Sequence, residues 1–136
     1  MAHSPEALLR ILRSTRTIAV VGLSNKPDRP SYEVASYLKD AGYRIIPVNP
    51  TVTEVLGERA YPGLRDVSEP VDVVLIFRRP SEVPAVVDDA VAVGAKAVWM
   101  QPGAENEEAA ARARAAGLEA VVGACMMTVH RALARA

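Results

Sequence analysis

The sequence has very little cysteine and histidine, and this scarcity argues against several classes of protein. One cysteine among 136 residues cannot form an internal disulfide, which fits a protein of the reducing cytoplasm. The single cysteine and the two distant histidines do not form a cluster that would bind a metal ion. We therefore expect a cytoplasmic protein without a metal site.

An excess of one charge and long apolar runs are also missing. Sixteen basic side chains balance sixteen acidic ones, whereas proteins that bind nucleic acid or anionic membranes usually carry an excess of basic residues. No apolar run approaches the roughly 18 residues that cross a bilayer, and the first residues lack the basic-then-apolar layout of a signal peptide. We expect neither a nucleic-acid partner nor a membrane partner.

Five short apolar runs are present, and all but the second are followed along the chain by a segment with helical periodicity. Half of the residues are apolar, and the length favours a single domain over residues 1–136. The predicted strands are 17–21, 43–48, 71–77, 96–100 and 118–122, and the predicted helices are 4–13, 31–41, 81–94, 105–116 and 125–134. We expect an irregular segment over 49–70. The alternation predicts an α/β fold with a Rossmann-like, doubly wound parallel sheet of about five strands and helices on both faces.

The first predicted strand ends in Gly22, within the stretch T-I-A-V-V-G-L-S-N-K-P-D-R-P-S. In a doubly wound sheet, ligands bind outside the carboxyl ends of the strands, so this loop is a candidate phosphate site. The dinucleotide fingerprint G-x-G-x-x-G would need glycine where Ser24 and Pro27 stand, and no G-K-[ST] motif occurs. Gly22 therefore predicts either a close approach to a ligand or an ordinary strand-ending turn.

The same loop carries positive charge next to a helix start. Lys26 and Arg29 precede Ser31, which begins the second predicted helix, and the free N–H groups of a helix start attract anions. Two cations there favour a ligand with several phosphates. The alternative is that both side chains are ordinary solvated loop charges.

The other strand ends also carry groups that bind rather than react. Phe77 could flank a planar base or belong to the core, and Arg78 is favoured over Arg79 as the inward-facing arginine. Gln101 and Gly103 follow the fourth strand. Because no general acid or base accompanies them, we expect binding without catalysis, and no catalytic residue is assigned.

Cys125 lies near the start of the last predicted helix. A helix start lowers the pKa of a thiol, so a reactive thiolate is one interpretation. A small buried side chain is the favoured alternative.

Five motifs together resemble the single-domain CoA-binding protein family, the bacterial YccU-like group. They are V-V-G-L-S-N-K-P-x-R-P-S, G-Y-R-I-I-P-V-N-P, V-D-V-V-L-I-F-R-R-P, V-W-M-Q-P-G and C-M-M, in that order. The resemblance covers residues 6 to 131. It extends to the N-terminal CoA-binding domain of the succinyl-CoA synthetase α subunit, which has a Rossmann-like sheet and holds the ADP part of coenzyme A at the strand ends.

The resemblance implies coenzyme A or an acyl-CoA as the ligand and assigns roles by position. It places Gly22, Ser24, Asn25 and Lys26 around the pyrophosphate, Val48, Asn49 and Pro50 beside the nucleotide, Phe77, Arg78 and Pro80 in the next wall, Gln101 and Gly103 near the pantetheine arm, and Cys125 at the edge. Lys26, Arg29 and Arg78 are candidates to meet the 3′-phosphate.

The sequence departs from the family pattern in two ways, and each limits which family properties the resemblance implies for this chain. Relatives often have an acid before the last histidine, but here Val129 precedes His130. The phosphohistidine domain of the synthetase is also absent, so synthetase activity is not implied.

Three alternatives stay open. The first is an NAD(P)-binding oxidoreductase or redox-sensing module, in which Asn49, Pro50 and Thr51 accept a 2′-phosphate. The second is an accessory subunit that lends this domain to a separate acyl-CoA enzyme. The third is a protein that forms a mixed disulfide between coenzyme A and Cys125. The sequence does not determine whether the chain forms a homo-oligomer.

Overall fold

The computed structural model describes residues 3–134 and contains a parallel sheet of five strands. The strands are β1 (Thr17–Val21), β2 (Arg44–Val48), β5 (Val73–Ile76), β6 (Ala97–Met100) and β7 (Glu119–Val122). They lie in the order β2-β1-β5-β6-β7. The predicted Rossmann-like α/β fold is confirmed, and each observed strand falls within a predicted one.

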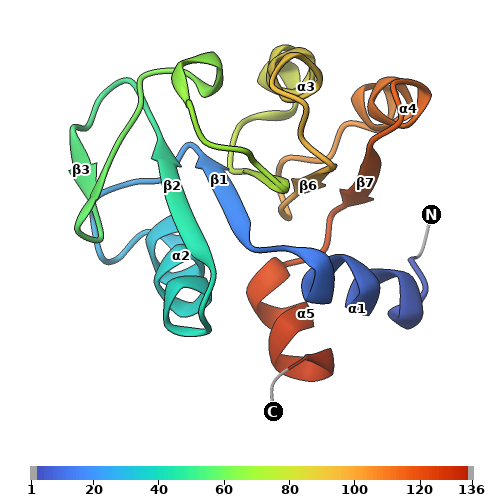
Figure 1. The fold of residues 1–136 in the computed structure, drawn as a ribbon, viewed down its shortest axis with the longest axis horizontal. Helices are drawn as coiled ribbons and strands as arrows, with labels where there is room; N and C mark the ends of the chain where they lie inside the picture. The colour runs from blue at the N-terminus through green and yellow to red at the C-terminus, as the bar shows by residue number, and fades with distance from the viewer. Residues whose placement is uncertain (1–2, 135–136) are drawn as a thin grey trace.

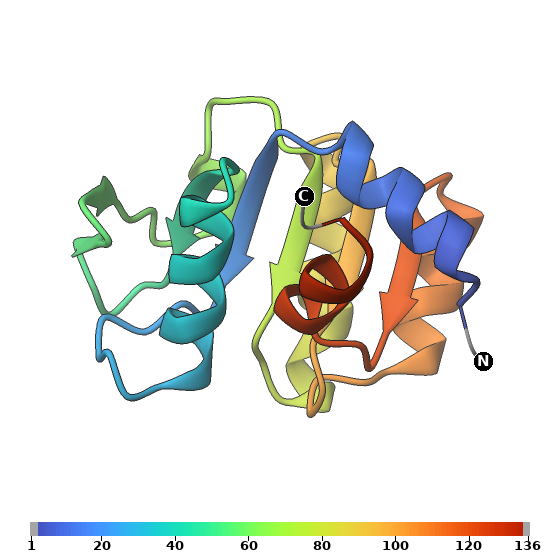
Figure 2. The same cartoon turned by 90° about the horizontal axis from the view of Figure 1, so that it is seen from below.

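Helices cover both faces of this sheet (Figure 1). One face carries α3 (Val83–Ala92), α4 (Glu107–Ala115) and the short 3-10 helix η1 (Leu64–Asp66). The other carries α1 (Pro5–Ser14), α2 (Pro30–Asp40) and α5 (Met126–Leu133), as Figure 2 shows. Because both faces are covered, the strands must be apolar on both sides, which explains their continuous Val- and Ile-rich runs.

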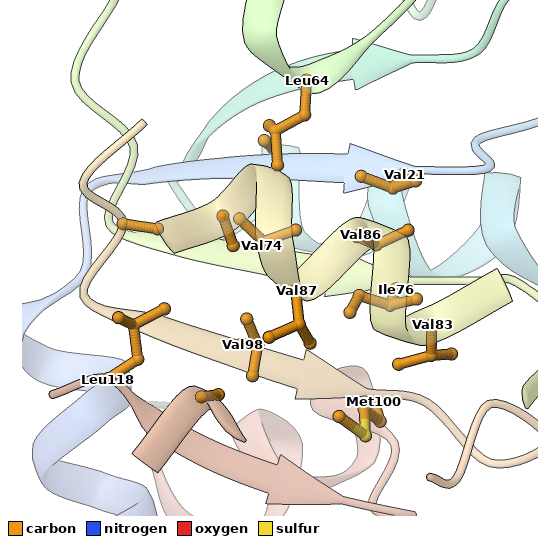
Figure 3. Close-up of a cluster of buried hydrophobic side chains, with 14 of the residues drawn as sticks. Val21, Leu64, Val74, Ile76, Val83, Val86, Val87, Val98, Met100 and Leu118 are labelled. Atoms are coloured by element: carbon orange, nitrogen blue, oxygen red, sulfur yellow. The ribbon is translucent and has the colours of Figure 1, made fainter. Parts of the chain in front are cut away.

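A core lies on each side of the sheet. Figure 3 shows the core beneath α3, where Val83, Val86 and Val87 pack onto Ile76 and Val98 of the strands. The opposite core contains Trp99, which is completely buried and whose indole N–H donates to the carbonyl of Ala124 at 2.8 Å. Trp99 is therefore a packing residue of this core.

The direction in which successive strands are added across the sheet reverses between β1 and β5. From β1 the chain passes through α2 to β2 on one side, and the strands from β5 onward extend to the other side. The carboxyl ends of β1 and β5 are therefore the switch point of the sheet, where ligands bind in this class of fold. In Figure 2 the strand ends and the starts of α2 and α5 gather at the lower edge.

The segment expected to be irregular contains a small hairpin instead. Strands β3 (Glu54–Val55) and β4 (Glu58–Arg59) pair antiparallel around a turn at Leu56 and Gly57, both with positive φ. No hairpin signal is visible in the sequence because two-residue strands are too short to show alternation, and leucine is not a residue that favours such a turn. The side chain of Lys39 donates to the carbonyl of Leu56 and secures the turn to α2.

Gly22 has the backbone geometry that requires glycine. Its φ is +90°, and a Cβ atom built on it would lie 2.1 Å from the carbonyl oxygen of Phe77, which follows β5. Its N–H donates to the carbonyl of Val48 at 2.9 Å. The tails of three neighbouring strands therefore meet at this residue.

We predict that Gly22→Ala lowers the free energy of unfolding by more than about 2 kcal/mol, because backbone strain and a clash with backbone act together. Gly117→Ala is the matched control, since Gly117 has a φ of +92° and open space around the Cβ position. Urea unfolding measures both. Equal losses of unfolding free energy in the two variants would show that the clash with Phe77 does not add to the destabilisation.

Candidate functional site

A crevice of about 590 Å³ opens at the switch point, between the starts of α2 and α5. The residues that line it come from the ends of β1, β5 and β6 and from the first turns of these two helices. They are Gly22, Ser24, Arg29, Pro30, Ser31, Glu33, Val34, Phe77, Arg78, Arg79, Gln101, Pro102, Gly103, Ala104, Cys125 and Met127. The structure thus brings together segments from positions 22 to 127, as the predicted sheet edge requires.

Hydrogen bonds within the loop after β1 fix its shape. The backbone N–H of Ser24 donates to the hydroxyl of Ser31 at 3.0 Å, and the N–H of Lys26 donates to the hydroxyl of Ser24 at 3.0 Å. Ser31 is 6% exposed. Asn49 joins this loop to the end of β2, because its side-chain amide donates to the carbonyl of Leu23 at 3.0 Å.

Three arginines place positive charge at the crevice. Arg29 is the residue before α2, and Arg78 and Arg79 follow β5. The side chain of Arg78 is 30% exposed and that of Arg79 is 84% exposed. Both pair with the same carboxylate of Glu82, at 3.8 Å for Arg78 and 2.9 Å for Arg79.

The other end of the crevice contains Gln101 and Cys125. Gln101 is 4% exposed, and its side-chain oxygen accepts the backbone N–H of Met126 at 2.8 Å, which fixes the start of α5. Cys125 is half-buried beside it. Burial raises the pKa of the Cys125 thiol, but hydrogen bonding with Gln101, Thr128 and Met127 outweighs this effect, so the pKa falls below its usual value.

A second cavity of about 550 Å³ lies at the same edge of the sheet, on the side of α3. It is lined by Val48, the last residue of β2, and by Pro50 two residues later. Leu64 of η1 and Val86 of α3 also line it. Arg78 lines this cavity as well as the crevice. Arg78 therefore lies where the two hollows adjoin.

Four predicted site residues line neither of these two cavities. Asn25 and Lys26 are exposed on the loop, and Pro80 is exposed at the start of a short 3-10 helix, η2 (Pro80–Glu82). Asn49 binds backbone at Leu23, and its side-chain oxygen accepts the backbone N–H of Thr51 at 2.9 Å. A ligand contact for any of these four residues stays a prediction.

Several lining residues were not identified from the sequence. Glu33 and Val34 lie one turn into α2, and Met127 lies two residues beyond Cys125 on α5. The signal that could have found them is helix geometry, because residues in the first turn of a helix face the same edge as its start. Glu33 matters because it adds a carboxylate near the arginines.

Within residues 3–134 the crevice contains one thiol, Cys125, and one carboxylate, Glu33. Asp72 lies at the opposite edge of the sheet, where it accepts the backbone N–H groups of Arg16 and Thr17 at 2.9 and 3.0 Å. The described residues include no group of three or more His, Cys, Asp or Glu side chains that could hold a metal ion. Nor do they include a helix with the length and apolar character to cross a membrane.

A family model described as a CoA-binding domain matches residues 16–131. The chain belongs to this CoA-binding domain family. The resemblance of its motifs to that family is confirmed. Its likeness to a relative of similar size is also extensive: the chain is 39% identical over 127 residues to the protein YneT of Bacillus subtilis, covering 93% of this chain and 94% of YneT.

Solved structures resemble this domain both in a chain of similar length and within a longer chain. A hypothetical protein from Pyrococcus horikoshii has a TM-score of 0.94 at 39% identity, over 97% of this chain and 93% of that one. A dinucleotide-forming acetyl-coenzyme A synthetase 1 from Ca. Korarchaeum cryptofilum has a TM-score of 0.71 at 30% identity, over 81% of this chain and 27% of that one. The CoA-binding domain thus corresponds to a limited part of the synthetase chain.

We predict that the Cys125 thiol of this CoA-binding domain becomes reactive at lower pH than an ordinary thiol. Its rate of alkylation by iodoacetamide should rise with pH. The midpoint of that rise should lie below 9.0, the usual pKa of a thiol, since hydrogen bonding stabilises the thiolate. Thr128→Val removes a hydroxyl that contributes to this effect and should move the midpoint upward. A wild-type midpoint at or above that of N-acetylcysteine would contradict the prediction.

Proposed function

We propose that this protein binds coenzyme A or an acyl-CoA through its ADP and pyrophosphate part, at the carboxyl edge of the sheet, and does not transform it. The observation that carries the proposal is the position of Arg78, which lines both the crevice and the second cavity. A long ligand with phosphates at its middle can occupy both hollows while its charge stays beside this guanidinium group.

Charge and helix orientation both support an anionic centre for the ligand. The starts of α2 and α5 face the crevice, and the N–H groups and dipole of a helix start favour anions. Arg29, Arg78 and Arg79 add fixed positive charge. Arginine suits this role because its fork can donate two parallel hydrogen bonds to a phosphate.

The side chains that line the second cavity and the crevice suggest how the ligand lies. In this arrangement, Val48 and Pro50 border the nucleotide in the second cavity, and Gly22 and Ser24 lie beside the pyrophosphate. The pantetheine arm follows the crevice past Phe77 and Gln101, and its sulfur end reaches Cys125. Lys26 stays a candidate for the 3′-phosphate because its side chain is exposed and free to turn.

The side chains of the crevice favour binding over catalysis. General acid–base catalysis needs a titratable group within hydrogen-bond reach of the reacting atom, usually oriented by a partner. Gln101, the polar side chain next to Cys125, is an amide and does not titrate. The charged groups of the crevice are the three arginines and Glu33 on α2.

We predict that coenzyme A and acetyl-CoA raise the melting temperature and that NAD and NADP do not. A ligand that binds the native state stabilises it by about 2.7 kcal/mol at a hundred times its Kd, so thermal-shift titration detects even moderate binding. Including dephospho-CoA in the panel measures the contribution of the 3′-phosphate. A shift with NADP and none with coenzyme A would instead favour the oxidoreductase or redox-sensing interpretation.

We further predict that Arg78→Ala weakens coenzyme A binding about tenfold or more, because a hydrogen bond to a charged group contributes roughly 1.5–3 kcal/mol. Arg79→Ala is the matched control: it removes the same charge from the next residue, whose side chain is 84% exposed. Its effect should stay below about threefold. Isothermal titration calorimetry compares the two, and equal losses would contradict the assignment of Arg78.

A further inference from the structure

Two helices that wall the crevice are joined to each other at a distance from it. The α2 helix contributes Ser31 and Val34 to the crevice, and α5 contributes Met127 just after Cys125. Further along the same helices, the hydroxyl of Tyr37 and the Nδ1 atom of His130 lie 2.9 Å apart, within hydrogen-bond distance. This is a direct side-chain hydrogen bond between α2 and α5, two helices that are far apart in the sequence.

An aromatic cluster surrounds this bond. The ring of His130 packs edge-on against Tyr37 and Tyr43, with ring centres 5.5 and 5.7 Å apart. The hydroxyl of Tyr43 donates to the carbonyl of Leu12 at 2.9 Å, which ties the cluster to α1. The guanidinium group of Arg131 lies 5.3 Å from the centre of the Tyr37 ring.

From this arrangement we infer that His130 is a positioning residue for the proposed ligand: its neutral ring holds α5 against α2 and so sets the width of the crevice, and its protonation weakens ligand binding. The inference rests on the proposed function. It also gives a role to a histidine for which the sequence offered no acidic partner, because the partner is the hydroxyl of Tyr37.

Protonation opposes this arrangement for physical reasons. In the neutral tautomer that leaves Nδ1 without a proton, the ring accepts a hydrogen bond from the Tyr37 hydroxyl. The protonated ring must donate at Nδ1 and so forces the hydroxyl to turn. The titratable or charged groups around the ring are Tyr37 on α2, Tyr43 after it and Arg131 on α5, while α1 contributes the carbonyl of Leu12. None of them is an acid that would stabilise a positive charge, and Arg131 already places a cation on the cluster.

The pH range follows from the direction of the pKa shift. Burial lowers the pKa of His130 below its usual 6.5. A group whose pKa is lower in the packed state takes up its proton more readily when the packing opens. Packing of α5 on α2 is therefore fully favoured above the usual pKa and weakens as the pH falls below it.

The test measures the Kd for coenzyme A by calorimetry from about pH 8 to about pH 5.5, across the titration of histidine. It compares the wild-type protein with His130→Asn and Tyr37→Phe. Asparagine carries its amide oxygen at the δ position, so it can accept the Tyr37 bond but does not titrate. Tyr37→Phe keeps the ring and removes the bond.

At pH 8 we expect Tyr37→Phe to bind roughly three- to tenfold more weakly than wild type, the effect of losing one hydrogen bond. His130→Asn keeps that bond but loses the ring contacts with Tyr37 and Tyr43, so its Kd at pH 8 is the reference against which its own pH profile is compared. Towards acid pH the wild type should lose a further three- to tenfold relative to His130→Asn. Because titration of the ligand's own phosphates affects all three proteins alike, the difference between the profiles isolates His130.

Two outcomes would overturn the inference, and they are distinguishable. Identical pH profiles for wild type and His130→Asn, with clear binding, would reject the role of His130 and leave the proposed function intact. No binding of coenzyme A by the wild type at any pH would reject the proposed function, and the inference with it. Circular dichroism of each protein at both pH limits confirms that a loss of binding is not a loss of fold.

Discussion

The crevice depends on the contact between Gly22 and the carbonyl of Phe77, which leaves no space for a side chain. At this contact the tail of β1 turns towards α2 on one face of the sheet, while the chain after β5 leads to α3 on the other. The two tails diverge from one point, and a hollow remains on each side of it. Arg78, one residue beyond Phe77, is placed by the same divergence at the junction of both hollows.

Most neutral polar groups of the site are bound to the protein itself. The hydroxyl of Ser31 and the amide of Asn49 each hold a backbone group of the loop after β1, and the side-chain oxygen of Gln101 holds the first backbone N–H of α5. These bonds keep the tails in fixed positions, so the shape of the crevice exists before any ligand arrives, which lowers the entropic cost of binding. The arginines provide the charge for recognition, and the neutral groups provide the framework.

The sequence predicted the sheet, its flanking helices and the edge at which the crevice lies, because these follow from local periodicity and from the rules of parallel sheets. It also identified Gly22 and Cys125 as lining residues. It did not reveal the hairpin around Leu56, whose turn uses an unfavoured residue, or the binding of Asn49 to Leu23. Such contacts join residues that are distant in sequence, and no local pattern encodes them.

The balanced charge of the chain conceals an uneven distribution. Some acidic side chains pair with basic ones away from the site, as Glu69 does with Arg44 and Glu119 with Arg10. Beside the crevice, by contrast, the carboxylate of Glu82 pairs with both Arg78 and Arg79. The crevice itself adds Arg29 and Glu33, so three guanidinium groups face two carboxylates and positive charge remains among them. A chain without net charge can therefore still present a local site for phosphates.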